Sequence, residues 1–420
     1  MIDSNRDQLF CLCRKSLYRE CAEEWKWDEE NCFRDIKKII AENGLISLLY
    51  RILKEENSKR HFIEDADFSE LTSFVKYAAF KELGNLQAIR LVNEESKKRN
   101  IKFVFFKGIL LADLYPQHTE RISCDSDILV SDGEKEAAEE LMRDMGYEKN
   151  LHSSKNHVQV YENKKYGHII ELHTRLWEDY EGPRVEALKK LKLADSEKII
   201  LTKACGLEVY TLGYKEHLIY QIFHIIKHFS LNGVGIRYLI DVTLFVNKYF
   251  DKIDFRQFWE DIRTLGYSCF TETFFIICVD ELKMTDKVFD SHPVKDIQGM
   301  DELKEDLLNV GNIMDKQAGW QIMGAMEAYF TGEASVPKSE FKRKMRMIFP
   351  SAKALPKVYD YAIKYPLLLP LAWVHRGVKF FIKKQFHKDD FYGISEKVDV
   401  GERRLRLIEE LELTMKEEKE

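Results

Sequence analysis

The N-terminal part of the chain carries apolar side chains at the three- and four-residue spacing of amphipathic helices. This pattern predicts helices over residues 1 to about 66, with two apolar groups: Leu9, Phe10, Leu17 and Tyr18, then Ile39, Ile40, Leu45, Leu48 and Leu49. A longer amphipathic helix is predicted from Leu71 to Ile89, with a charged tail at 94–99 and a stop at Asn100.

The pattern changes at Ile101, where short apolar runs typical of buried strands begin. Strands are predicted over 101–106, 124–130, 158–161 and 168–173, with a hairpin turn at 162–165. A short helix is predicted over 109–115, and a second helix starts with Asp132 as its N-cap and stops at Gly146. Residues 78 to about 177 therefore form a small α/β unit.

After Pro183 the pattern predicts helices again, to about residue 330, and five of the eight prolines follow residue 336. The expected organisation is an N-terminal helical region (1–77), a small mixed-sheet core (78–182), a helical domain that completes a cleft (183–335) and a C-terminal helical extension (336–420). The fold class expected is α+β, with a small mixed sheet and flanking helices embedded in a predominantly helical chain.

Composition narrows the classes of protein that fit this pattern. The 420 residues are 45% hydrophobic and 32% charged, which is typical of a globular protein. A net charge of −6 makes a dedicated nucleic-acid binder an unlikely class. We expect a cytoplasmic protein, because no apolar signal region follows Met1, no apolar run spans a bilayer, and the eight scattered cysteines fit reduced thiols.

Candidate chemistry begins with Asp125 and Asp127, which point to the same face of a strand. Two adjacent carboxylates repel each other unless a cation lies between them, which predicts Mg²⁺ or Mn²⁺. Glu171 lies in an otherwise apolar strand with His173 on the same face, and would add a third carboxylate. The plain alternatives are a solvated strand end for the aspartates and a water-facing edge strand for Glu171.

Lys107-Gly108 follows the first strand and suggests a phosphate contact. Glycine lets the backbone approach a ligand, and the lysine could place a charge on a phosphate. Arg121 could clamp a phosphate, or could pair as a loop arginine with Glu120 or Asp113.

These motifs have a recognisable order. The unit contains a strand, Lys107-Gly108, a helix ending in Leu114-Tyr115-Pro116, the run from Arg121 through Asp125 and Asp127 to Val130, a helix ending in Gly146-Tyr147, and Glu171-Leu172-His173. Over about 78 to 180 this order resembles the uncharacterised nucleotidyltransferase family of the DNA polymerase β-like superfamily. The resemblance continues through His224, His228, Arg237 and Asp241, and returns at 348–351 and 366–376.

The resemblance implies a fold and a reaction. It places Gly108 at a glycine that contacts a nucleoside triphosphate (NTP), and Asp125, Asp127 and Glu171 at three carboxylates that hold two metal ions. It implies transfer of a nucleoside monophosphate to a hydroxyl, by in-line displacement, with Glu171 also accepting a proton. Two departures stand out: Ile109 occupies the place of a serine, and the interval from Gly108 to Asp125 is long.

Four residues further along could form a wall of the same pocket. His224 and His228 lie four apart on one helical face, together with His217. They could bind zinc, form a polar structural cluster or line the substrate pocket. Arg237 and Asp241 are also four apart, which predicts an ion pair on the next helix.

The C-terminal extension combines basic residues with the apolar run 367–374. Lys342-Arg343-Lys344-Met345-Arg346 precedes this run, and Lys379, Lys383 and Lys384 follow it. One interpretation is peripheral contact with an anionic membrane. The other is a buried C-terminal helix with solvated flanks.

The hypothesis is therefore a metal-dependent nucleotidyltransferase whose partners are a nucleotide and an unidentified acceptor, which could be a small molecule, a sugar-like compound or a protein. One alternative is a catalytically silent binding or regulatory module, similar to an antitoxin, that keeps the fold. Another is a glycosyltransferase that uses Asp-x-Asp for a sugar nucleotide. That enzyme class needs a larger Rossmann-like region before the motif, where this chain has about 100 residues of predicted helix.

Overall fold

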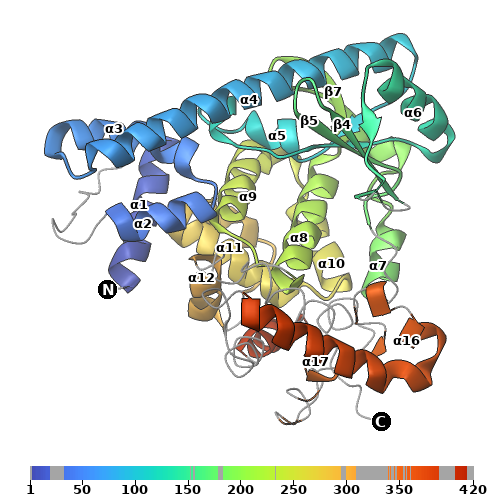
Figure 1. The fold of residues 1–420 in the computed structure, drawn as a ribbon. Helices are drawn as coiled ribbons and strands as arrows, with labels where there is room; N and C mark the ends of the chain where they lie inside the picture. The colour runs from blue at the N-terminus through green and yellow to red at the C-terminus, as the bar shows by residue number, and fades with distance from the viewer. Residues whose placement is uncertain are drawn as a thin grey trace.

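The computed structural model has an α+β fold and describes residues 2–18, 33–151, 153–154, 157–177, 183–231, 233–294, 299–308, 339, 341, 345, 348–352, 355, 357–359, 361–386 and 403–413. Four helices precede the sheet, as predicted: α1 (Ile2–Tyr18), α2 (Phe33–Glu42), α3 (Ile46–Arg60) and α4 (Asp65–Lys98). The α4 helix has 34 residues and extends from the N-terminal helices across the sheet (Figure 1). Its end at Asn100, which adopts a positive φ, confirms the predicted stop.

The sheet has seven strands: β1 (Val104–Phe105), β2 (Ser126–Leu129), β3 (Glu148–Lys149), β4 (Val158–Asn163), β5 (His168–His173), β6 (Ile199–Ala204) and β7 (Leu207–Leu212). Their order is β3-β4-β5-β2-β1-β7-β6. The sheet is mixed, because β2 is parallel to β5 and β1 to β7, while the other neighbours are antiparallel. The strands near 101–106, 124–130, 158–161 and 168–173 are confirmed, with shorter bounds for the first two.

Two predictions about this region are wrong. The chain is not simply helical after Pro183, because α7 (Pro183–Leu191) is followed by the β6–β7 hairpin, which pairs with β1. Asp132 is also not the N-cap; Ser131 takes that position before the short 3₁₀ helix Asp132–Glu134, and α6 (Lys135–Asp144) follows. Gly146 ends α6 with a φ of +79°, as predicted. The domain boundaries stay a prediction.

The two faces of the sheet contact different helices. Ile128 and Val130 point to the face where residues of α4 and α6 complete an apolar cluster. Val104, Phe106 and Leu129 belong to a second, larger cluster, which includes α8 (Tyr214–Leu231) and α9 (Ile236–Tyr249). Alternation along β2 therefore directs Asp127 toward the face that meets α8 and α9.

The larger cluster joins the N-terminal helices to the second half of the chain. It includes α10 (Phe255–Thr264), α11 (Ser268–Leu282) and α12 (Met300–Leu308). The Tyr18 hydroxyl donates a hydrogen bond to the Leu282 carbonyl at 2.9 Å, so α1 and α11 lie together. The rest of the predicted helical stretch, from 309 to about 330, lies outside the described residues.

The C-terminal extension contributes α16 (Tyr361–Lys364), a 3₁₀ turn at Pro366–Leu368 and α17 (Leu369–Phe386). The other 3₁₀ helices of the described residues are His118–Glu120, Ser196–Lys198, Phe250–Lys252, Asp286–Phe289 and Lys357–Tyr359. Among the described residues, no helix combines the length and apolar character needed to cross a membrane. The six described cysteines are all free thiols.

Candidate active site

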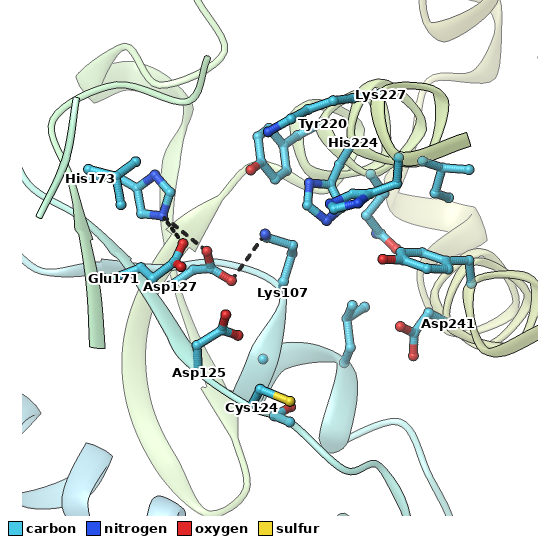
Figure 2. A pocket seen from close by; sticks show the side chains of 18 of the residues that line it. Lys107, Cys124, Asp125, Asp127, Glu171, His173, Tyr220, His224, Lys227 and Asp241 are labelled. Carbon is cyan, nitrogen blue, oxygen red and sulfur yellow. Dashed lines mark hydrogen bonds and ion pairs between the residues drawn. The ribbon is translucent and has the colours of Figure 1, made fainter. Parts of the chain in front are cut away.

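Strand pairing brings the predicted acidic residues together. Asp127 lies on β2 directly beside Glu171 of the parallel strand β5, and His173 follows on the same face of β5. Asp125 immediately precedes β2 and points to the same side (Figure 2). The predicted shared face of Asp125 and Asp127, and that of Glu171 and His173, are both confirmed.

Asp127 is the buried centre of this group, with 6% of its side chain exposed. Lys107 Nζ lies 3.1 Å from one carboxylate oxygen, and His173 Nε2 lies 3.0 Å from the other. Burial alone would raise the pKa of Asp127, but the two cationic partners outweigh burial and hold that pKa below its usual range. The ionised form of Asp127 is therefore favoured, with the partly buried Lys107 as its counter-ion.

His173 and Asp125 respond differently to the same charges. Burial would lower the pKa of His173, but hydrogen bonds to Asp127 and Glu171 raise it overall. The distance from His173 Nε2 to the nearer Glu171 oxygen is 3.5 Å. Burial, together with the charges of Asp127 and Glu171, raises the pKa of Asp125 to about 6. The site thus concentrates more negative charge than Lys107 alone neutralises.

This donor set fits a divalent cation. Ligand atoms of Asp127, Glu171 and His173 all lie within 4.8 Å of one another. Carboxylate oxygens suit Mg²⁺, and an added imidazole suits Mn²⁺. Asp125 borders the same cavity, and burial, followed by the charges of Asp127 and Glu171, raises its pKa.

Lys107 has an unusual backbone conformation. Its φ of 57° and ψ of −124° belong to a region that glycine favours, although the glycine is the next residue, Gly108. The Lys107 backbone N–H donates to His217 Nε2 at 3.1 Å. Burial and the Lys107 charge lower the pKa of His217 to about 3, so its ring stays neutral and accepts that bond. His217 therefore holds the turn and does not line the cavity.

Gly108 begins α5 (Gly108–Ala112) and borders open space, because a Cβ placed there would meet no atom within 4 Å. A ligand could approach the backbone at this point. The α5 helix has only five residues, so any attraction from its N-terminus is local. The phosphate-binding role of Lys107 and Gly108 stays a prediction.

The expected partners of Arg121 and Asp241 are wrong. Arg121 pairs neither with Glu120 nor with Asp113; its Nε and Nη2 donate to the two oxygens of Asp241, both at 2.9 Å. Arg237 does not pair with Asp241, and instead donates to the Ile122 carbonyl at 2.9 Å.

Tyr115 completes this buried cluster, donating to Asp241 at 2.8 Å. The ion pair joins the loop before β2 to α9 and so fixes the sheet against the helical domain. A phosphate contact by Arg121 stays a prediction, since three of its N–H groups already have protein partners.

An aromatic wall faces the carboxylates from α8 and α9. Tyr220 stacks on His224 at 6.0 Å between ring centroids, and His224 contacts His228 at 4.3 Å. Tyr238 lies 6.2 Å from each histidine. Burial and then the Lys107 charge hold the pKa of His224 well below its usual value. Among the described residues, no carboxylate or thiol groups with these histidines as a possible ligand set, so the geometry favours an aromatic pocket wall over a zinc site.

One cavity of about 440 Å³ connects these groups, and apart from His217 the candidate residues identified from the sequence border it: Lys107, Gly108, Arg121, Asp125, Asp127, Glu171, His173, His224, His228, Arg237 and Asp241. Sequence analysis missed Tyr220, Lys227 and Tyr238, which also border it. Tyr220 and Lys227 could have been found from their helical spacing relative to His224 and His228. The cavity volume lies in the range of small-molecule sites.

Solved structures similar to this chain are nucleotidyltransferases or resemble them. One is "ANT(2″)-Ia in complex with adenylyl-2″-tobramycin", with 11% identity over 39% of this chain and 87% of that chain, and a TM-score of 0.30. Another is an antigenic nucleotidyltransferase-like protein from Paracoccidioides brasiliensis, with 14% identity over 50% and 93%, and a TM-score of 0.33. No curated protein matches the chain.

The family comparison covers more of the chain and includes the whole cavity. Residues 30–282 match the family described as "Uncharacterised nucleotidyltransferase". This stretch is more than half of the chain, and it includes the sheet, α8 and α9. The chain therefore belongs to the uncharacterised nucleotidyltransferase family.

Proposed function

We propose that this protein transfers a nucleoside monophosphate from an NTP to a hydroxyl group of an acceptor, with Mg²⁺ or Mn²⁺. The observation that carries the proposal is the single cavity in which Asp125, Asp127 and Glu171 share one face of the sheet. Clustered acids at the edge of a small-molecule cavity suit a metal–triphosphate complex, because its divalent cations would neutralise the carboxylates and the phosphates together.

The proposed reaction is a substitution at phosphorus, with no change of oxidation state. The acceptor oxygen forms a bond to the α-phosphorus, and the bond from that phosphorus to the β-bridging oxygen breaks. Pyrophosphate leaves, and the hydroxyl proton passes to a carboxylate and then to solvent. A bound divalent ion would supply charge neutralisation for the triphosphate and a lower pKa for the attacking hydroxyl.

The chain's own residues have distinct proposed roles. Asp125, Asp127 and Glu171 would hold the cation, and Glu171 would also accept the proton. Lys107 and Gly108 would contact the triphosphate, with Arg121 holding the loop in place.

The wall opposite the acids would bind the remaining parts of the substrates. His224, His228 and Tyr220 offer ring faces and polar ring or hydroxyl atoms. Such a wall suits a nucleoside base or a hydroxylated acceptor, either a small molecule, a sugar-like compound or a protein side chain. Arg237 and Asp241 border the same side.

Metal-dependent nucleotide binding tests this proposal. The unfolding temperature is measured with each of the four common NTPs, in Mg²⁺, in Mn²⁺ and in chelator. A ligand at 100 times its Kd adds about 2.7 kcal/mol of stability, which gives a clear rise in Tm. The rise should require the metal and should disappear in Asp125→Asn with Asp127→Asn. The exposed Asp132→Asn is the matched control and should respond like the parent.

Two alternatives predict other outcomes. A silent regulatory module predicts that the pure protein shows no response to any NTP with metal. A glycosyltransferase predicts a response to nucleoside diphosphate sugars instead. The mixed strand order and family membership argue against the glycosyltransferase. Retained NTP binding in the double variant would contradict the assignment of the acids.

A further inference from the structure

The C-terminal extension exposes a line of aliphatic side chains. Leu367 of the 3₁₀ turn is 94% exposed, and Leu371, Val374 and Val378 of α17 are 58%, 63% and 50% exposed. Their spacing of four, three and four residues places them on one face of the helix. Isolated exposed leucines are ordinary, but an aligned apolar stripe usually marks an interaction surface. We call these four residues the α17 stripe.

The opposite side of α17 is packed, so the direction of the stripe is fixed. Ala372 is fully buried in a small cluster with Ala362, Leu355 and Tyr359. The Trp373 indole N–H donates to the Pro350 carbonyl at 2.8 Å. The helix therefore has a protein-facing side and an outward-facing side. The interpretation of a buried C-terminal helix is wrong for the outward side.

The surrounding sequence is strongly basic. Residues 341–386 contain eleven lysines and arginines and one acidic residue, Asp360, whereas the whole chain carries −6. Two of these basic residues, Lys364 and Lys379, are described and exposed, one at each end of the stripe. Lys364 Nζ lies 5.6 Å from the centroid of the ring of Tyr365, which is itself exposed. The segment that carries the stripe is thus basic in sequence, and its two exposed described lysines flank the stripe.

We infer that the C-terminal extension docks on the surface of an anionic lipid bilayer, with the α17 stripe inserted among the acyl chains and Lys364 and Lys379 at the headgroups. An aliphatic stripe flanked by lysines and a tyrosine is the pattern of a helix that lies in the plane of the interface. Electrostatic attraction to anionic lipid adds to apolar insertion, about fivefold in affinity for each basic residue near the surface.

The chemistry of the stripe favours lipid over nucleic acid as the partner of this basic region. Nucleic-acid sites present aromatic rings for stacking and polar groups for hydrogen bonds, and the four stripe residues offer neither. The docking would be peripheral, since no described helix is suited to crossing the bilayer. In Figure 1, α17 lies on the opposite side of the molecule from the sheet and α4.

Co-sedimentation of the full chain with vesicles tests the inference. One set of vesicles contains phosphatidylcholine alone, and the other contains phosphatidylcholine with phosphatidylglycerol. The parent protein should bind the anionic vesicles at least tenfold more tightly than the neutral ones, with binding that falls as salt rises. Leu371→Ser with Val374→Ser should weaken binding at least tenfold. Lys364→Glu with Lys379→Glu should do the same.

A matched control uses two exposed aromatic residues outside the extension. Tyr77 and Phe80 on α4 are 67% and 78% exposed, and Tyr77→Ser with Phe80→Ser should leave vesicle binding unchanged. Far-ultraviolet circular dichroism identifies any variant that fails to fold, and the charge variant then carries the test. The inference is overturned if the parent ignores anionic vesicles, if the α4 control weakens binding equally, or if an oligonucleotide binds while vesicles do not. None of these results depends on nucleotide binding in the cavity.

Discussion

Asp125→Asn should stabilise the metal-free protein while weakening the proposed metal site. The structure raises the pKa of Asp125 from 3.8 to about 6, chiefly through burial and then through the charges of Asp127 and Glu171. The folded state therefore binds the Asp125 proton more tightly than the unfolded state does. The stability that comes from this proton is complete below about pH 4 and is lost as the pH rises through about 6.

The size of this stability change follows from the unfolded and folded pKa values of Asp125. The difference between 3.8 and about 6 corresponds to about 3 kcal/mol at most. Partial exposure of the carboxylate to water reduces this to about 1–2 kcal/mol of net gain for a neutral amide. Asp125→Asn should therefore raise the free energy of unfolding at pH 8 by that amount, and the gain should shrink toward zero at pH 4.

Urea unfolding in chelator at pH 8 and pH 5 measures this difference. Asp127→Asn is the matched comparison, because the same substitution should have the opposite sign there. The pKa of Asp127 is held low by Lys107 and His173, so its ionised form stabilises the folded state above its unfolded pKa, and that contribution is lost as the pH falls. If Asp125→Asn destabilised the protein at pH 8, or if both variants shifted in the same direction, the electrostatic reasoning would be refuted.

Three further predictions concern the residues around these acids. Lys107→Met leaves the buried Asp127 without its counter-ion and should cost about 3–5 kcal/mol in chelator, with part of the loss restored by Mg²⁺ in thermal melts. Arg121→Met alone should lower the free energy of unfolding by about 3–5 kcal/mol, because it leaves the buried Asp241 without its partner. Arg121→Met with Asp241→Leu should lower it by less than the sum of the two single changes. Strict additivity in this double-mutant cycle would contradict the buried pair. Mg²⁺ affinity should fall as the pH drops through about 6, because protonated Asp125 is a poorer ligand, and calorimetric titration that shows no such dependence would contradict this.

Local sequence patterns were sufficient to predict which residues of the candidate site share a face of one strand or helix. The two-residue period of strands placed Asp125 with Asp127, and Glu171 with His173, and the helical period placed His224 with His228. These relations depend only on backbone geometry within one element. The residues then met in one cavity because β2 and β5 are neighbours in the sheet. The resemblance to the family supplied that juxtaposition, which periodicity alone does not give.

The β6–β7 hairpin, which was not predicted, does have a recognisable sequence pattern. Along β6 and β7, Lys203 and Glu208 point outward while Ala204 and Leu207 are buried, and Cys205-Gly206 forms the two-residue turn with positive φ at both positions. This alternation is the strand period, within a region classed as helical. Its parallel pairing with β1, about a hundred residues earlier in the chain, is a non-local contact that no local pattern specifies.

The predicted ion pair between Arg237 and Asp241 is wrong for a different reason. Arg237 and Asp241 satisfy the helical spacing rule, but such surface pairs contribute only about 0.3–0.5 kcal/mol. Asp241 is buried, and a buried carboxylate requires a partner that satisfies both of its oxygens. Arg121 offers the planar fork that does so, from 120 residues away in sequence. The strained backbone of Lys107 was equally hidden, because glycine is the residue expected at positive φ.

The most direct test of nucleotidyl transfer uses NTP labelled at either the α- or the γ-phosphate. Each label is incubated with Mg²⁺, the protein and a mixture of small-molecule and protein acceptors, and the products are separated from free nucleotide. Nucleotidyl transfer at these acids predicts that label from the α-position, and not from the γ-position, becomes attached to an acceptor, with loss of the signal in Asp125→Asn with Asp127→Asn. Transfer of the γ-label, or α-label transfer that survives the double substitution, would contradict it.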